Sequence, residues 1–155
     1  TQGYSSAASD VYKRQIYMKS RINPRISIHP KIIGYCIEER KKSILMTAAL
    51  ELDTDITFIN GSSANEKVAY VAAINGYSKS EETVENPPEC EVLIMSGLKN
   101  SVIDRLLRIL RNENASIDLK CTVTPFNQDW ELYRLIEELK REHESMHKIN
   151  GGKNL

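Results

Sequence analysis

The chain has 155 residues, of which 41% are hydrophobic and 27% charged, and these values indicate one soluble globular domain rather than a disordered chain. Its 21 basic and 21 acidic side chains give a formal net charge of zero, which argues against a dedicated nucleic-acid-binding protein. No apolar run approaches the ~20 residues that a membrane-spanning helix needs, so no membrane association is expected.

The first part of the chain is expected to lie outside the folded body. Residues 1–17 follow neither a helical nor a strand period and contain SAASDVYKRQ, which resembles an adapter-derived stretch at the ends of proteins translated from metagenomic reads. We expect residues 1–17 to be a disordered sequencing artefact, with Met18 as the natural start; a natural disordered tail is the alternative. Residues 18–31 form a basic lead-in, broken by Pro24 and Pro30.

A single α/β domain is expected over residues 32–147, followed by a disordered tail at 148–155. In its first half (32–77), short apolar runs predict strands, and apolar side chains at helical spacing predict helices. The predicted elements are a strand at 32–36, a helix at 37–52, a strand at 56–59 and a helix at 65–75 that Gly76 would end. A polar loop at 78–89 then divides the body into two similar halves.

The second half (90–147) repeats this alternation. The predicted elements are a strand at 91–95, a helix with the apolar stripe 102–110, a strand at 119–123 and a helix from the Asn127 cap to about His147. Strands that alternate with helices favour a parallel sheet with covering helices. The sequence therefore predicts a small four-stranded, mainly parallel sheet in (βα)4 order. One sequence does not determine the order of the strands in the sheet, for which 2-1-3-4 is our guess.

Polar residues at the carboxyl ends of the predicted strands are the candidate ligand site, because open α/β sheets bind ligands there. The candidate rim consists of Ser96, Asn100, Thr124, Asn127 and Trp130. Helix amino termini at this rim could hold a small anion or a nucleotide, although neither GxGxxG nor GxxxxGK[ST] occurs. The same residues suit turns and helix caps, and Trp130 suits packing across the preceding loop. No catalytic residue is assigned.

The three cysteines, Cys36, Cys90 and Cys121, form no CxxC pair, and no secretory signal precedes them, so a reducing, cytoplasmic setting is favoured. Cys36 stands at the start of the first predicted helix, where the pKa of a thiol can fall. Because no resolving cysteine lies nearby in sequence, we interpret both Cys36 and Cys121 as packing residues.

One literal metal-site motif occurs near the end of the chain. His143-Glu144-Ser145-Met146-His147 matches HExxH, in which two histidines bind zinc and the glutamate acts as general base. The eight residues that follow contain no His, Asp, Glu or Cys as a third ligand, and the surrounding helix is charged. We therefore interpret the motif as a polar last turn, with His143 and His147 as metal ligands only in the alternative.

Several segments of the second half carry a family resemblance. They are the strand ending 95–97, the stripe 103–111, the segment 117–120, Thr124-Pro125-Phe126-Asn127 with Trp130, and the segment 138–143. Residues 91–144 thereby resemble the bacterial family numbered 3783 among the domains of unknown function, most specifically in the pattern Thr-Pro-x-Asn-x-x-Trp. The segment 68–77 is similar to the region that precedes this domain in Firmicutes-type members. The resemblance implies a small cytoplasmic bacterial α/β protein and implies no activity, because none is assigned to the family.

The leading functional interpretation is a non-enzymatic regulatory or interaction module without a cofactor, which would bind a protein partner or a second copy of itself. The alternatives are a zinc-dependent hydrolase acting through His143 and His147, and a small-anion or nucleotide binder at the strand carboxyl ends. Metal analysis separates the first alternative from the leading interpretation, and a ligand screen separates the second.

Overall fold

The computed structural model describes residues 29–153, so the expectations for residues 1–17 and for most of 18–31 lie outside the described residues. Four strands form one sheet: β1 (Lys31–Tyr35), β2 (Asp55–Ile59), β3 (Val92–Ser96) and β4 (Leu119–Thr122). The α-helices of this part of the chain are α2 (Glu39–Glu51), α3 (Val68–Val71), α4 (Asn100–Asn112) and α5 (Leu132–Lys153).

The strands lie in the order β2-β1-β3-β4, which agrees with the guessed order, but the sheet is mixed. β1 pairs with β2 in parallel and β3 pairs with β4 in parallel, whereas the central strands β1 and β3 run antiparallel. The prediction of a mainly parallel sheet is therefore wrong. The molecule instead joins two parallel strand pairs that point in opposite directions.

The antiparallel central strands are accompanied by a short α3. We expect a helix over 65–75, but α3 has four residues and stops before Ala73, whose φ of 59° breaks the helix. One turn rises about 6 Å, whereas a five-residue strand spans about 17 Å, so α3 cannot carry the chain back along the sheet. β3 begins opposite Tyr35, the last residue of β1.

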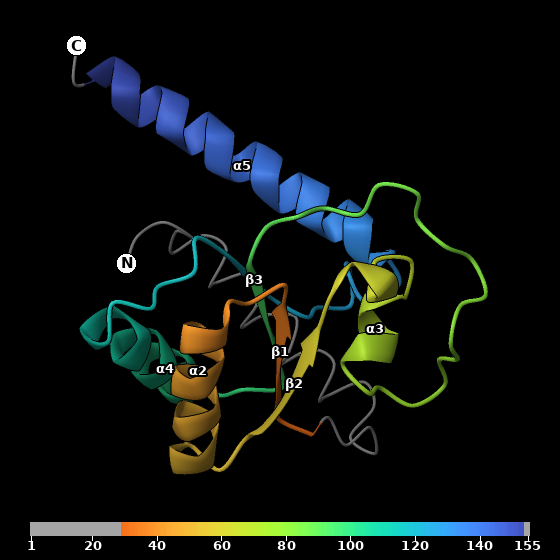
Figure 1. Ribbon diagram of the computed structural model, residues 1–155, viewed down its shortest axis with the longest axis horizontal. Coiled ribbons are helices and arrows are strands. Elements are labelled where there is room, and N and C mark those ends of the chain that lie inside the picture. The colour runs from red at the N-terminus through yellow and green to blue at the C-terminus, as the bar shows by residue number, and fades with distance from the viewer. Residues whose placement is uncertain (1–28, 154–155) are drawn as a thin grey trace.

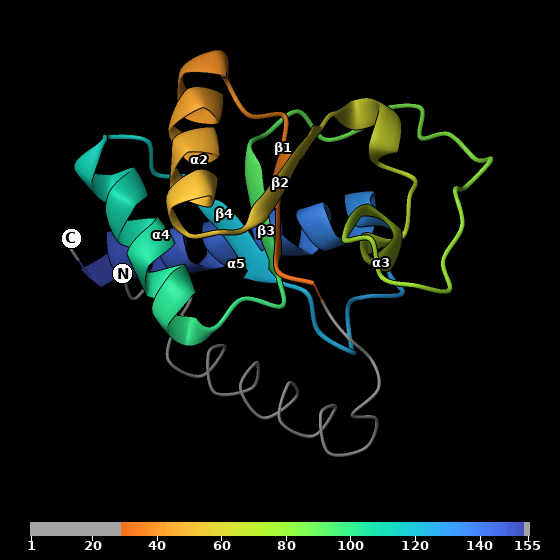
Figure 2. The same ribbon diagram turned by 90° about the horizontal axis from the view of Figure 1, so that it is seen from below.

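Helices cover both faces of the sheet. Figure 1 and Figure 2 show α2 and α4 together on one side of the sheet and α3 and α5 on the other. The first face buries Ile32, Leu93, Leu45 and Leu106 in one core cluster, and the second buries Ile33, Ile94, Val68, Leu132 and Ile136 in another. Successive residues of β1 and β3 enter opposite clusters, as the two-residue period of a strand requires.

The two halves repeat one arrangement about a local two-fold axis. The axis passes between Ile33 and Ile94, which face each other at the centre of the β1–β3 ladder. The outer helices α2 and α4 each have 13 residues. Positive φ angles stand at equivalent places before and after them, at Cys36 and Asp53 around α2 and at Gly97 and Asn114 around α4. The chain is thus built from two similar strand-helix-strand-helix units.

The last helix breaks this symmetry. α5 has 22 residues against the four of α3, and it extends past the sheet toward the C-terminus (Figure 1). It is also longer than the helix to about His147 that the sequence predicts. In the described part of the chain, neither α5 nor any other helix is both long enough and apolar enough to cross a bilayer.

Candidate functional site

The mixed sheet places the carboxyl ends of its four strands at two opposite ends of the sheet. β1 and β2 finish at one end and β3 and β4 at the other. All five candidate residues lie at the end of β3 or follow β3 or β4, so they lie together at the end of the sheet where these two strands finish. Ser96 closes β3, and the Val123 N–H donates to Met95 O at 2.9 Å, which brings the start of the loop after β4 beside it.

Thr124 and Asn127 serve as internal caps of a turn. The Asn127 Oδ1 accepts from the Thr124 N–H at 2.8 Å, and the Asn127 Nδ2 donates to Thr122 O at 3.0 Å. The Thr124 Oγ1 accepts from the Phe126 N–H at 3.2 Å. Local bonds of this kind stabilise turns. These two side chains therefore fix the loop at 124–131 and have few polar atoms left for a ligand.

Ser96 and Asn100 have a different environment from the turn. Ser96 is 1% exposed, and its Oγ has no hydrogen-bond partner among the described residues. Asn100 is half-buried as the first residue of α4, and the preceding Lys99 gives that helix no side-chain cap. A buried hydroxyl is normally hydrogen-bonded, so Ser96 is the least satisfied of the five candidates.

A junction between the two halves holds the base of this loop, and sequence reasoning does not find it. The Val68 N–H donates to Trp130 O at 2.9 Å, and the Leu132 N–H donates to Glu66 O at 2.8 Å. These reciprocal bonds surround the bridge between Lys67 and Glu131, whose side chains also form an ion pair of 3.5 Å between Nζ and Oε1. α3 and α5 thus begin at one shared, two-fold point.

Glu66 is the buried charged side chain of this junction. It is 4% exposed, its Oε1 accepts from the Ser80 N–H at 2.7 Å, and its Oε2 has no partner in the described chain. Its equivalent in the second half is Trp130, as the reciprocal bonds define. One side of the axis therefore carries a buried carboxylate that holds the loop at 78–89, and the other carries an indole.

Two large aromatic side chains of the loop at 124–131 reach solvent. Phe126 is 72% exposed and Trp130 is 39% exposed. The indole thus keeps a solvent-facing part beyond the packing role that the sequence favours. Phe126 is absent from the predicted rim, and its place in a polar turn is the one sequence feature that agrees with its exposure. The two rings are carried by a backbone that the junction fixes at one end and Asn127 fixes at the other.

The three cysteines are packing residues in the structure. All three are free and half-buried, and all pack against the core cluster beneath α3 and α5. Burial raises the pKa of the Cys90 thiol, and burial raises that of Cys121 to about 12. Near Cys36, the buried Tyr35 donates its hydroxyl to Pro88 O at 2.8 Å, and burial raises its pKa as well. Since a thiolate is the reactive form, Cys90 and Cys121 are poor nucleophiles at neutral pH.

The HExxH match lies on α5. His143 is half-buried and Glu144 is exposed, whereas the side chain of His147 lies outside the described residues. Among residues whose side chains are described, no three His, Cys, Asp or Glu gather in a way that could hold a metal ion. The described geometry therefore gives a zinc hydrolase no support.

Comparison with known proteins finds a family match for one part of the chain. No curated protein and no solved structure matches the sequence. Residues 91–146 match the family described as "Domain of unknown function (DUF3783)", and this segment runs from the start of β3 through α4 and β4 into α5. The C-terminal part of the chain thus matches the DUF3783 family model, in agreement with the resemblance that its sequence motifs indicate.

Proposed function

We propose that this protein is a non-enzymatic interaction module that binds a protein partner through Phe126 and Trp130 on the loop at 124–131. The observation that carries the proposal is the exposure of these two rings, 72% and 39%, on a hydrogen-bonded loop. Aromatic side chains dominate the energetic centres of protein interfaces. A preformed loop loses less conformational entropy on binding than a mobile one.

The loop also has the support that an anchor needs. Bonds from Asn127 hold its beginning, and the reciprocal bonds between Glu66, Trp130, Val68 and Leu132 hold its end. The partner surface would be an apolar pocket that accepts the Phe126 ring. A bacterial cytoplasmic setting belongs to the same proposal, and the free state of all three cysteines supports a reducing compartment.

The test uses the full chain as affinity bait, with quantitative mass spectrometry of what it retains. Phe126→Ala/Trp130→Ala is the test variant. Met46→Ala/Leu50→Ala on α2 is the matched control, because Met46 and Leu50 are also exposed, at 53% and 84%. A partner identified in this way is then purified and titrated by calorimetry.

We expect the partner to keep its affinity for the control variant. For the aromatic variant we expect a loss of about 30-fold or more, as hot-spot residues give. Equal affinity for both variants, or an equal loss in both, contradicts the proposal. Size-exclusion chromatography with light scattering shows whether the partner is a second copy of this chain.

A further inference from the structure

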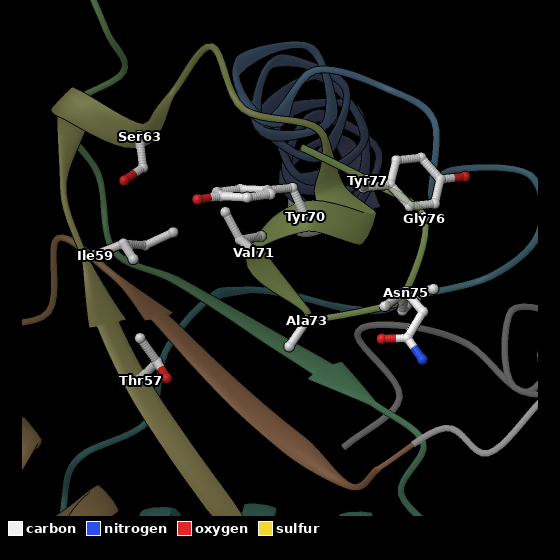
Figure 3. Close-up of a pocket in the computed structure, with 10 residues that line it drawn as sticks. Thr57, Ile59, Ser63, Tyr70, Val71, Ala73, Asn75, Gly76 and Tyr77 are labelled. Carbon is white, nitrogen blue, oxygen red and sulfur yellow. The ribbon is translucent and has the colours of Figure 1, made fainter. Parts of the chain in front are cut away.

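We propose that a hollow between β2 and α3 binds a neutral, hydroxyl-bearing small molecule of the size of a nucleoside or a monosaccharide. The hollow has a volume of about 470 Å³, and Figure 3 shows it bordered by Ile59 of β2 and by Tyr70 and Val71 of α3. Ligand pockets in proteins usually enclose roughly 300–1,000 Å³. The hollow is connected to the loop at 124–131, because its lining residue Tyr77 donates its hydroxyl to Asp129 Oδ1, but the proposal does not depend on the function of that loop.

The local two-fold axis explains why the hollow exists. Thr57 of β2 faces Ile33, and Cys121 of β4 faces Ile94 in the same register, so Thr57 and Cys121 are equivalent. In the second half α5 continues over this place, and its Leu135 and Leu139 pack into the same core cluster as Cys121. In the first half α3 stops at Val71. The hollow is thus the space that a helix fills on the other side.

The side chains that line the hollow do not suit the apolar face of a helix. Where the second half has Cys121 and Leu139, the first half has Thr57 and Asn75, and both line the hollow. Each change replaces an apolar packing side chain with one that forms hydrogen bonds. An occupant with polar groups therefore fits the site better than an apolar helix face.

Three hydroxyl groups around the hollow are free for a ligand. The side chains of Thr57, Ser63 and Tyr70 form no hydrogen bond with any described residue. Figure 3 shows the Tyr70 hydroxyl pointing toward the side of the hollow where Ser63 and Ile59 lie, with Thr57 further along β2. A hydroxyl both donates and accepts, so the three groups match a ligand that carries hydroxyls of its own.

The charge of the lining selects against ions. None of the side chains that line the hollow is charged. A phosphate or carboxylate placed there would lose hydration without gaining an ion pair, which is unfavourable. The apolar surface of Ile59, Val71 and the Tyr70 ring suits the face of a base or of a sugar ring. Together these features indicate a neutral polar molecule.

The test is an NMR titration of the ¹⁵N-labelled full chain with adenosine and with D-glucose, in separate experiments. We expect at least one of them to give saturable shifts confined to residues 57–77, and the two arms distinguish a nucleoside from a sugar. AMP and glucose 6-phosphate, the charged counterparts, should bind more weakly. Absence of saturable shifts with both neutral probes overturns the proposal, and so does tighter binding of the phosphates.

Two single substitutions in the lining test whether the ligand binds in the hollow. Tyr70→Phe and Thr57→Val remove one hydroxyl each at nearly constant shape, and each should weaken binding roughly fivefold, the usual effect of one hydrogen bond. Tyr133→Phe is the matched control, because Tyr133 is a half-buried tyrosine of the second half that does not line the hollow. Unchanged affinity in both hydroxyl variants overturns the proposal.

Discussion

The two halves of the molecule share a plan but differ in what covers them. Each half has a buried strand, a 13-residue helix and a parallel edge strand, and the central strands meet at Ile33 and Ile94. The second half then closes its edge strand with α5, whereas the first half stops after the single turn of α3. The family match covers only the second half. The two halves thus share their core arrangement and differ mainly in the length of the final helix.

The halves are also joined more firmly than two separate domains would be. The β1–β3 ladder runs along the full length of both strands, and α2 and α4 share one core cluster. The backbone bonds between Glu66, Trp130, Val68 and Leu132 add a second connection on the opposite face. One continuous core unfolds as one unit in most small domains, so we expect the repeat to behave cooperatively.

The largest expected effect comes from equivalent core leucines. Leu45 on α2 and Leu106 on α4 occupy matching positions, and both are fully buried. Leu45→Ala and Leu106→Ala should each lower the free energy of unfolding by about 2–5 kcal/mol, the range for cavity formation in a core. Urea unfolding followed by far-UV circular dichroism and by Trp130 fluorescence should give coincident single transitions in both variants. Separate transitions would show that the halves unfold independently.

A smaller loss of stability is expected from a substitution at Gly34, one position where the two halves differ. Gly34 in β1 is equivalent to Met95 in β3, and a Cβ at Gly34 would lie 2.8 Å from both Ile37 Cγ1 and Phe58 Cδ1. Gly34→Ala should therefore destabilise the protein by about 1–3 kcal/mol through overpacking. Thermal unfolding measures the loss. The double variant Gly34→Ala/Phe58→Leu should recover part of it, and no recovery would mean that Phe58 is not the limiting contact.

The next effect depends on pH. The Glu91 carboxylate accepts from Lys41 Nζ at 2.7 Å and from the Glu38 N–H at 3.0 Å. The equivalent residue before β1 is Pro30, so only α2 has this connection. Burial alone would raise the pKa of Glu91, but these two bonds hold it below its ordinary value of about 4.5. The stabilisation is therefore complete above that value and is lost as the pH falls through the lower folded-state pKa.

Glu91→Gln should cost about 1 kcal/mol at neutral pH, because the pair is partly exposed. Urea unfolding at pH 7 and at stepwise lower pH should show the difference from the unaltered protein shrinking toward zero in acid. Glu89→Gln is the control, since Glu89 is an exposed neighbour in sequence. A difference that persists or grows in acid contradicts the assigned role of Glu91.

These comparisons also show what the sequence can predict. The stripe that includes Ile103, Leu106 and Leu110 predicts α4, and all three side chains are buried. Apolar runs likewise predict the four strands, whereas their order in the sheet agrees with a guess that no residue pattern determines. The direction of β3 is not predicted correctly. A helix is expected over 65–75, whereas α3 has four residues and β3 begins opposite Tyr35. The positive φ of Ala73 ends that helix, and alanine is a good helix former that gives no warning of it.

The candidate site is predictable only in part for a similar reason. The turn at 124–127 carries its own signal, since Thr124 and Asn127 are typical capping residues and the structure uses them as caps. The junction between the two halves has no sequence signal, because it is formed by backbone atoms of residues that lie far apart in the chain. Backbone hydrogen bonds have no side-chain signature. The hollow beside β2 is equally hidden, because it depends on the helix that is missing there.

The smallest expected effect concerns the exposed ring that the proposed function requires. Phe126 is equivalent to Ser62, and both backbone N–H groups donate to a capping side chain, to Thr124 Oγ1 at 3.2 Å and to Asn60 Oδ1 at 2.9 Å. Phe126→Ser therefore places the residue of the first half into the same turn of the second. Because the ring is 72% exposed, the free energy of unfolding should change by no more than about 0.5 kcal/mol. A loss well above that in urea unfolding would mean that the ring is packed in the free protein, and an aromatic anchor available to a partner would then be excluded.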